Sequence, residues 1–205
     1  PWFSEPPPRS DNVGQMAATA SRDAYLRVGL DILASDGYGA LKQSEVCRRM
    51  GVTTGSFYHF FRNWADYTRA LPDYWFTTHT QQHLERLLAE PDADAALDRL
   101  ISYGLKLPHG AEGAIRSWGS ADPAVRHVVE AADRLRYDVV HNIVGRLLNP
   151  EAAARYAHWA LLIIVGYEQT TLPVDLDTLS WTAEHWIKSI ADERANLRAG
   201  RTAAG

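Results

Sequence analysis

The hydrophobic positions of the chain repeat with the spacing of an α-helix. The first such stretch runs from Ser21, a suitable N-cap, to Gly37, which is a common residue at a helix end. Within it, apolar side chains recur three and four positions apart, as at Tyr25, Val28 and Ile32. This spacing places them on one face of a helix. We therefore predict an amphipathic helix over this stretch.

Two shorter helices follow, with a tight turn between them. We predict the first over residues 43–50, with Val46 and Cys47 on its inner face, and the second from Thr53, its N-cap, to about residue 60. Gly51 lies between them and is the residue expected to end the first helix. Three short helices with a tight turn before the last are typical of a helix-turn-helix unit.

The remainder of the chain has the same helical spacing, and we find no β pattern and no internal repeat. The fold class predicted is all-α, with about nine helices. The domains predicted are a disordered N-terminal arm at 1–20, a helix-turn-helix domain at 21–68 and a larger helical domain at 69–205. The further helices predicted cover residues 63–88 (beginning at Asn63 or Asp66), 91–107, a short piece around 115–118, 123–147, 150–167, and a last helix after Pro173.

Composition and charge narrow the class of protein. The 205 residues are 46% hydrophobic and 22% charged, with a single cysteine, which is ordinary for a globular protein without disulfides. We see no secretory leader, and the longest apolar stretch, 160–165, is too short to span a membrane. We expect a soluble, cytoplasmic protein.

Residues 9–69 carry eight Lys/Arg against six Asp/Glu, whereas residues 70–205 carry thirteen against eighteen. We therefore expect residues 9–69, which carry the excess of positive charge, to be the part that contacts a polyanion.

The stretch GVTTGSFYHFF, residues 51–61, combines aromatic and small polar residues in an unusual way. Phe57, Phe60 and Phe61 share one helix face, and we assign them to the core. Core packing is the common alternative for Tyr58 as well. A helix that enters the DNA major groove needs small or hydrogen-bonding residues on its outer face, which favours DNA contact for Tyr58 and His59.

From Gly37 to Tyr67 the sequence, GYGALKQSEVCRRMGVTTGSFYHFFRNWADY, resembles the N-terminal signature of the TetR family of bacterial transcriptional regulators. Residues 112–125, EGAIRSWGSADPAV, are similar to a stretch seen in many members. Trp64 and Thr54 depart from the basic residues that many members have there. The resemblance implies DNA contacts for Lys42, Ser44, Thr53, Thr54, Ser56, Tyr58 and His59.

The larger domain contains many aromatic and histidine residues on different helices. Eight of them could line one apolar cavity for a small molecule, although plain packing is an equal alternative for each one. His79 and His83 also have the i, i+4 spacing of metal ligands, but we favour solvated or pocket-lining histidines and expect no metal and no cofactor. The predicted ligand-binding residues are Trp75, His79, Tyr103, Trp118, Tyr137, His141, Trp159 and Tyr167.

Residues 160–167 are apolar on nearly every side, so a helix there must be covered on two faces. We predict that the same helix of a second subunit covers it, which gives a homodimer, as in the family that the chain resembles. The function expected is a repressor that leaves a double-stranded DNA operator when a small apolar or aromatic effector binds. The alternatives are a DNA-binding regulator that answers a protein partner, and an all-α enzyme. The enzyme is the less favoured alternative, since the sequence lacks a Gly-x-Ser-x-Gly motif and a phosphate loop, whereas regulation by a protein partner stays open.

Overall fold

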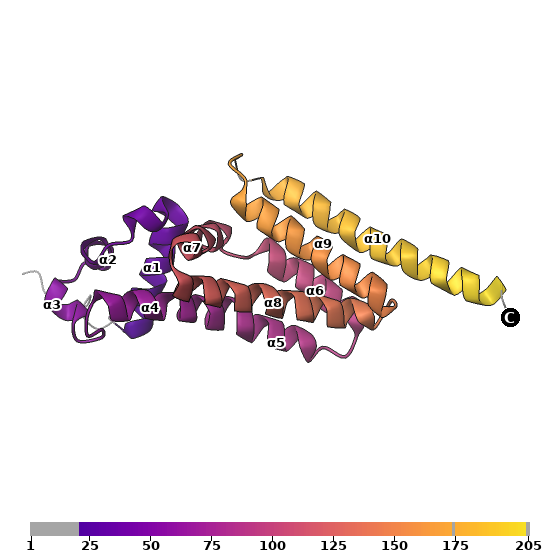
Figure 1. Ribbon diagram of the computed structural model, residues 1–205, viewed down its shortest axis with the longest axis horizontal. Helices are drawn as coiled ribbons and strands as arrows, with labels where there is room; N and C mark the ends of the chain where they lie inside the picture. The colour runs from indigo at the N-terminus through magenta and orange to yellow at the C-terminus, as the bar shows by residue number, and fades with distance from the viewer. Residues whose placement is uncertain (1–20, 174, 204–205) are drawn as a thin grey trace, which may run out of the picture.

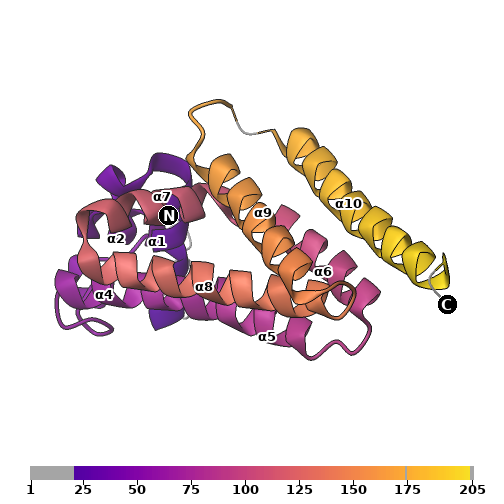
Figure 2. The same ribbon diagram turned by 45° about the vertical axis from the view of Figure 1, so that its right-hand side comes forward.

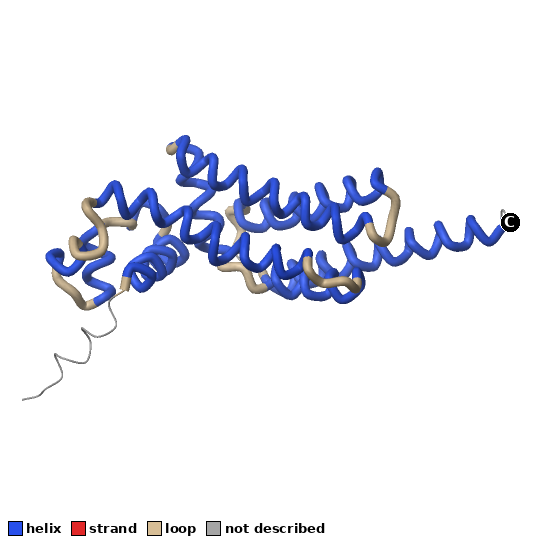
Figure 3. The backbone as a smooth tube through the Cα atoms, turned by 90° about the horizontal axis from the view of Figure 1, so that it is seen from below, coloured by secondary structure: helices blue, strands red, loops and turns tan. Residues whose placement is uncertain are grey.

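The computed structural model of the protein describes residues 21–173 and 175–203. Every regular element in these two ranges is helical, which confirms the all-α class (Figures 1 and 3). The arm predicted at 1–20 lies outside the described residues. The elements are α1 (Arg22–Asp36), η2 (Tyr38–Ala40), α2 (Gln43–Met50), α3 (Thr54–Phe57), α4 (Trp64–Trp75), η3 (Phe76–Gln81), α5 (Gln82–Leu88), α6 (Ala93–Leu105), α7 (His109–Ala121), α8 (Pro123–Gly145), α9 (Pro150–Gln169) and α10 (Leu176–Ala203).

The ends of the first two helices confirm the sequence analysis. Ser21 Oγ accepts a hydrogen bond from the Ala24 amide at 3.1 Å, as an N-cap does. Gly37 ends α1, and Gly51 ends α2 with φ of 66°, in the left-handed region that glycine adopts without strain. These two glycines fix where α1 and α2 stop.

The third helix is shorter than predicted. Thr53 caps it as expected, through a bond of 3.4 Å from the Ser56 amide, but α3 ends at Phe57 and not near residue 60. Beyond this point the amides of His59 and Phe60 bond to carbonyls three residues back. The chain therefore continues as tight turns of the kind that often close a helix.

Aromatic side chains form the core of the N-terminal unit. Phe57 and Phe61 are buried as predicted, and their ring centroids lie 5.1 Å apart, whereas Phe60 is half-buried. Tyr67, on α4, packs on Phe61 at 5.0 Å and donates its hydroxyl to the carbonyl oxygen of Tyr25 at 2.9 Å. This hydrogen bond fastens α4 to α1.

One continuous helical run joins the N-terminal unit to the rest of the protein. Asn63 caps α4, and α4 passes into η3, a π-helical segment, and then into α5 without a break (Figure 1). The helix predicted over 63–88 is thereby confirmed. Counting this run as one, the described residues form nine helices besides the 3-10 turn η2. Within them, no helix is both long and apolar enough to cross a membrane.

The larger part of the protein is a helical body built around α8 and α9. These two helices pack along each other, α5 and α6 lie against α8, and α10 lies on the outer side of α9 (Figures 1 and 2). At the other end of the body, α7 packs on both α1 and α8. The short piece predicted around 115–118 is the middle of α7, which extends further in both directions. Both α7 and α4 therefore connect the N-terminal unit to the body.

The contact between α1 and α4 leads to a stability prediction. A Cβ atom added at Gly29 would lie 2.1 Å from the Tyr67 hydroxyl and 3.0 Å from Leu71 Cδ2. Both neighbours are fully buried, so they have little room to move. We expect Gly29→Ala to lower the free energy of unfolding by about 1–3 kcal/mol.

Thermal unfolding of this variant measures the effect. Gly145→Ala is the matched control, because its added Cβ would meet only Ala153 Cβ at 3.8 Å, an ordinary contact, on the exposed side of α8. The control should keep or slightly raise the melting temperature. Equal melting temperatures for the two variants would show that α1 and α4 do not meet as described.

Candidate DNA-binding and ligand-binding sites

The residues predicted to contact DNA lie on α2, on α3 and on the segments beside them. These elements form one end of the molecule, away from the body (Figure 1). Tyr58 has 53% of its surface exposed although it follows the buried Phe57 directly. The structure leaves six of the seven predicted side chains exposed, namely those of Lys42, Ser44, Thr53, Thr54, Tyr58 and His59.

Ser56 differs from the other six. It is half-buried, and its Oγ accepts a hydrogen bond from the Tyr25 hydroxyl at 3.0 Å. Because Tyr25 belongs to α1, this bond fixes the orientation of α3 relative to the first helix. The contact of Ser56 with DNA bases stays a prediction, and its hydroxyl already has one partner within the protein.

Acidic residues pair with several of the cations at this end. Arg48 and Arg49 both bond to Glu45, and Arg49 also bonds to Asp36. The hydrogen bonds from Arg48 and then Arg49 lower the pKa of Glu45 to about 2. Lys42, in contrast, forms no ion pair with a carboxylate of the described residues. Its charge is therefore available to an external anion.

The body contains an apolar cavity between α5, α6, α8, α9 and α10. About 90 Å³ inside it is open to the centre of a water molecule. Its walls are almost entirely aliphatic, and Arg136 is the charged residue among them. The lining residues include Leu84, Leu100, Ile101, Tyr103, Val140, Ala157, Leu161, Ile164, Leu179 and Trp186.

The structure brings only one of the eight predicted ligand-binding residues, Tyr103, to this cavity. The expectation that the eight line one cavity is therefore wrong for this pocket. Trp118 instead stacks on Tyr38 at 4.7 Å, beside the N-terminal unit, and Trp75 is buried in the same core. Helical spacing shows that such a side chain is buried, but it does not show against which helix.

The other predicted positions are distributed over the body surface and its edges. Tyr137 stacks on His141 at 5.9 Å, Trp159 stacks on Tyr156 at 5.9 Å and is partly exposed, and Tyr167 contacts His109. His79 lies at the edge of shallower hollows, one of which it shares with His83. In the described part of the chain, no three His, Cys, Asp or Glu side chains gather in a group that could hold a metal ion.

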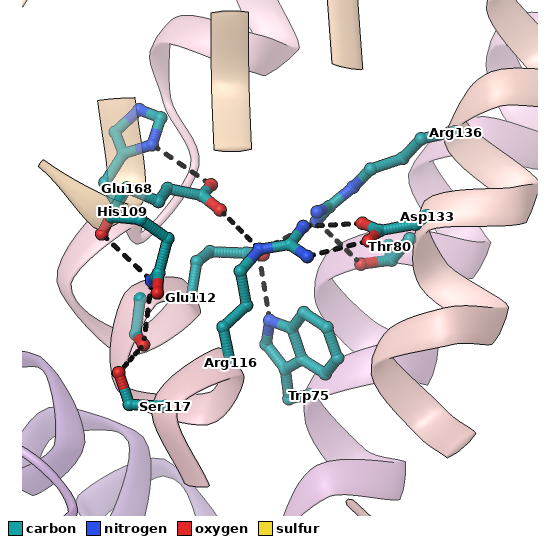
Figure 4. A network of polar contacts seen from close by, with 11 residues as sticks. Trp75, Thr80, His109, Glu112, Arg116, Ser117, Asp133, Arg136 and Glu168 are labelled. Atoms are coloured by element: carbon teal, nitrogen blue, oxygen red, sulfur yellow. Dashed lines mark hydrogen bonds and ion pairs between the residues drawn. The ribbon is translucent and has the colours of Figure 1, made fainter. Parts of the chain in front are cut away.

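Beside the cavity lies a buried polar network that the sequence analysis did not identify (Figure 4). Glu112 of α7 is its centre and is fully buried. Glu112 Oε1 accepts a hydrogen bond from Trp75 Nε1 at 2.9 Å, and Arg136 Nη2 donates to both carboxylate oxygens at 3.0 and 2.9 Å. Arg136 Nη2 also lies 3.2 Å from Thr80 Oγ1. The network thus joins α4, η3, α7 and α8.

Burial and the charge of Arg136 act in opposite directions on the pKa of Glu112. Burial raises the pKa of Glu112, while Arg136 lowers it. Since every bond that Glu112 accepts comes from an N–H donor, the geometry suits the carboxylate form. A signal was present in the sequence, because Arg136 falls within the apolar stripe of α8 that includes Ala132 and Val139.

A second group of charged residues adjoins the first (Figure 4). Arg116 donates to both carboxylate oxygens of Asp133 at 2.7 and 2.5 Å and to Glu168 at 3.2 Å. His109 Nδ1 lies 3.5 Å from the other oxygen of Glu168. These contacts connect α7 with α8 and α9, so α7 is bonded to the body at several points.

Comparisons with known proteins agree with this architecture. No family model matches the sequence. The transcriptional regulator AcuR of Cereibacter sphaeroides is 31% identical over 116 residues, which cover 57% of this chain and 51% of AcuR. The chain therefore matches about half the length of this curated relative.

Solved structures match over most of the chain. SCO4454, a TetR-family transcriptional regulator from Streptomyces coelicolor, aligns with a TM-score of 0.69 and 16% identity over 84% of this chain and 94% of that one. A transcriptional regulator from Saccharomonospora viridis, solved in complex with choline, aligns with a TM-score of 0.67 and 15% identity over 82% and 95%. Helix order and these alignments lead to one conclusion: the protein has the all-α fold of the TetR-family transcriptional regulators.

Proposed function

We propose that the protein is a homodimeric transcriptional regulator that binds DNA through α2 and α3 and leaves it when a small molecule enters the body cavity. The observation that carries the proposal is the set of exposed hydroxyl, imidazole and lysine side chains on a helix-turn-helix unit that a buried aromatic core supports. Such a unit presents its last helix to the major groove. The fold, which is that of known regulators, supports the same function.

The exposed residues divide into two kinds of contact. Lys42 and Tyr58 suit phosphate oxygens, since one has an unpaired charge and the other an exposed hydroxyl. Thr53 and Thr54 begin α3, where small side chains allow close approach to base edges. Phosphate contacts then supply affinity for any DNA, and the threonines supply part of the sequence preference.

A dimer explains how such a small unit reads an operator. Trp159 and Leu162 on α9 and Trp181 on α10 are large apolar side chains on the outside of the body, with Leu162 71% and Trp181 58% exposed. Exposed apolar side chains on neighbouring helices mark protein interfaces. A two-fold axis there would place two N-terminal units on the same DNA. Ile164, which also belongs to the predicted apolar segment, lines the cavity instead.

Ligand binding would act on DNA binding through the helices shared by both parts. The cavity is lined by Arg136, whose carboxylate partner on α7 also holds Trp75 of α4. A ligand that prefers one arrangement of these helices shifts the population toward it. A coupling free energy of about 1–3 kcal/mol would release DNA roughly 5- to 150-fold more readily.

Selection of bound sequences from random double-stranded DNA by the purified protein tests the function. We expect an enriched palindromic motif whose half-sites lie about one helical turn, roughly 34–36 Å, apart or a multiple of it. A variant with both Lys42→Ala and Tyr58→Phe serves as the control and should enrich the motif less. Absence of any enriched motif would contradict the proposal. A small-molecule screen against the DNA complex then separates a ligand-responsive regulator from one that answers a protein partner.

A further inference from the structure

The apolar cavity contains one charged side chain whose hydrogen-bonding capacity is only partly used. Arg136 lines the cavity together with aliphatic residues from five helices. The guanidinium Nη2 bonds to Glu112 and Thr80, but Nε and Nη1 are buried and have no hydrogen-bond partner among the described protein groups. Buried donors without partners are costly, so an acceptor that reaches them gains affinity.

Tyr103 and Trp186, the other polar side chains that line the cavity, make no hydrogen bond to Nε or Nη1 of Arg136. The Tyr103 hydroxyl donates to the carbonyl oxygen of His79 at 2.7 Å. Burial raises the pKa of Tyr103 above its ordinary value although the nearby Arg136 opposes this, so the hydroxyl keeps its proton at neutral pH. Trp186 Nε1 donates to the carbonyl oxygen of Tyr156 at 3.1 Å. The indole therefore has its partner away from the cavity.

The charges around Arg136 decide which acceptor fits. Arg116 and Arg136 supply two positive charges, and Glu112, Asp133 and Glu168 supply three negative ones, a formal balance of −1. A carboxylate ligand would meet Glu112 across the same guanidinium in a poorly screened interior. A cationic ligand would meet Arg136 itself and would bring donors where an acceptor is needed.

We infer that the cavity binds an uncharged, largely apolar molecule with one carbonyl-type oxygen, and that Arg136 donates a hydrogen bond to this oxygen. The aliphatic walls hold the hydrocarbon part of the ligand, and the guanidinium fixes its orientation. Only the regulatory role of the bound ligand rests on the proposed function. Binding itself requires neither DNA nor a dimer.

Four probes of similar length test the chemistry of the site by calorimetry with the full chain at pH 7.5. They are 2-heptanone, which is an acceptor only; heptane, which has no polar group; hexanoate, an anion; and hexylammonium, a cation. We expect 2-heptanone to bind about tenfold or more tightly than heptane, the gain of one hydrogen bond to a charged donor. Hexanoate should bind at least about tenfold more weakly than 2-heptanone, because Glu112 repels it.

Two variants connect the preference to Arg136. Arg136→Lys keeps a positive charge for Glu112 but removes the guanidinium N–H groups. The preference for 2-heptanone over heptane should then fall below about threefold, with the affinity for heptane unchanged. Arg86→Lys, on the exposed side of α5 and outside the cavity lining, is the matched control and should keep the preference. If Arg136→Lys does not fold, the double variant Arg136→Met/Glu112→Gln removes both charges and every donor at position 136, and it should show the same loss.

Several results would overturn the inference. These are binding of heptane as tight as that of 2-heptanone, tighter binding of hexanoate, an unchanged preference in a folded Arg136 variant, or failure of all four probes to bind. None of these results bears on DNA binding, which the selection experiment measures separately. Loss of enrichment on random DNA with intact ketone binding would instead reject the regulator function and leave the inferred site in place.

Discussion

Replacement of Glu112 by alanine is expected to lower the free energy of unfolding by about 3–5 kcal/mol. The variant leaves Arg136 buried with its charge uncompensated, and it also removes the acceptor for Trp75 Nε1. The penalty follows from desolvation, since Arg136 and Trp75 are both buried. Denaturant titration of parent and variant at one protein concentration measures the difference.

A second variant separates the charge from the packing. In Glu112→Ala/Arg136→Met both charges are absent, so the loss should be smaller than for Glu112→Ala alone. Glu112→Gln keeps an acceptor oxygen and should fall between the parent and the alanine variant. A change of less than about 0.5 kcal/mol for Glu112→Ala, the level typical of a surface substitution, would contradict the buried network.

Leu162→Asp is expected to produce monomers that no longer bind an operator. If the exposed faces of α9 and α10 form the two-fold contact, this variant places a carboxylate from each subunit in an apolar interface. An uncompensated buried charge costs about 3–5 kcal/mol, which raises the dimer dissociation constant roughly 10²- to 10³-fold or more. Analytical ultracentrifugation measures the dissociation constant directly.

Leu172→Asp is the matched control for this prediction. Leu172 is 72% exposed and lies in the connection between α9 and α10, on neither helix of the proposed contact, so its variant should dimerise like the parent. A parent protein that is monomeric at micromolar concentration would reject the dimer. A Leu162→Asp variant that remains dimeric would place the interface elsewhere.

Local signals predicted most of the fold. Ser21, Gly51 and Asn63 mark helix ends through their own hydrogen bonds or backbone angles, so their effect does not depend on distant residues. α3 ended early because tight turns beyond Phe57 replace the regular helical bonds. Such a change depends on packing and is not visible in spacing alone.

The ligand site was less predictable for a physical reason. Trp118 and Tyr137 have the helical spacing of buried residues, but spacing does not determine which helix each one faces, and they lie outside the cavity. The cavity depends on how five helices diverge, which is a property of the whole body. Arg136 would have been a better guide than the aromatic residues, because a charged residue on an apolar helix face requires a buried partner.

The salt dependence of operator affinity tests the central claim, that α2 and α3 bind DNA, most directly. For Lys42→Ala we predict weaker binding to all sequences and a slope of log K against log salt that is smaller by about one unit. Tyr58→Phe should weaken all binding without changing the slope, and Thr54→Ala should change the preferred base at one or two positions with the parent slope. If all three variants keep the parent's affinity, slope and sequence preference, this surface does not contact DNA.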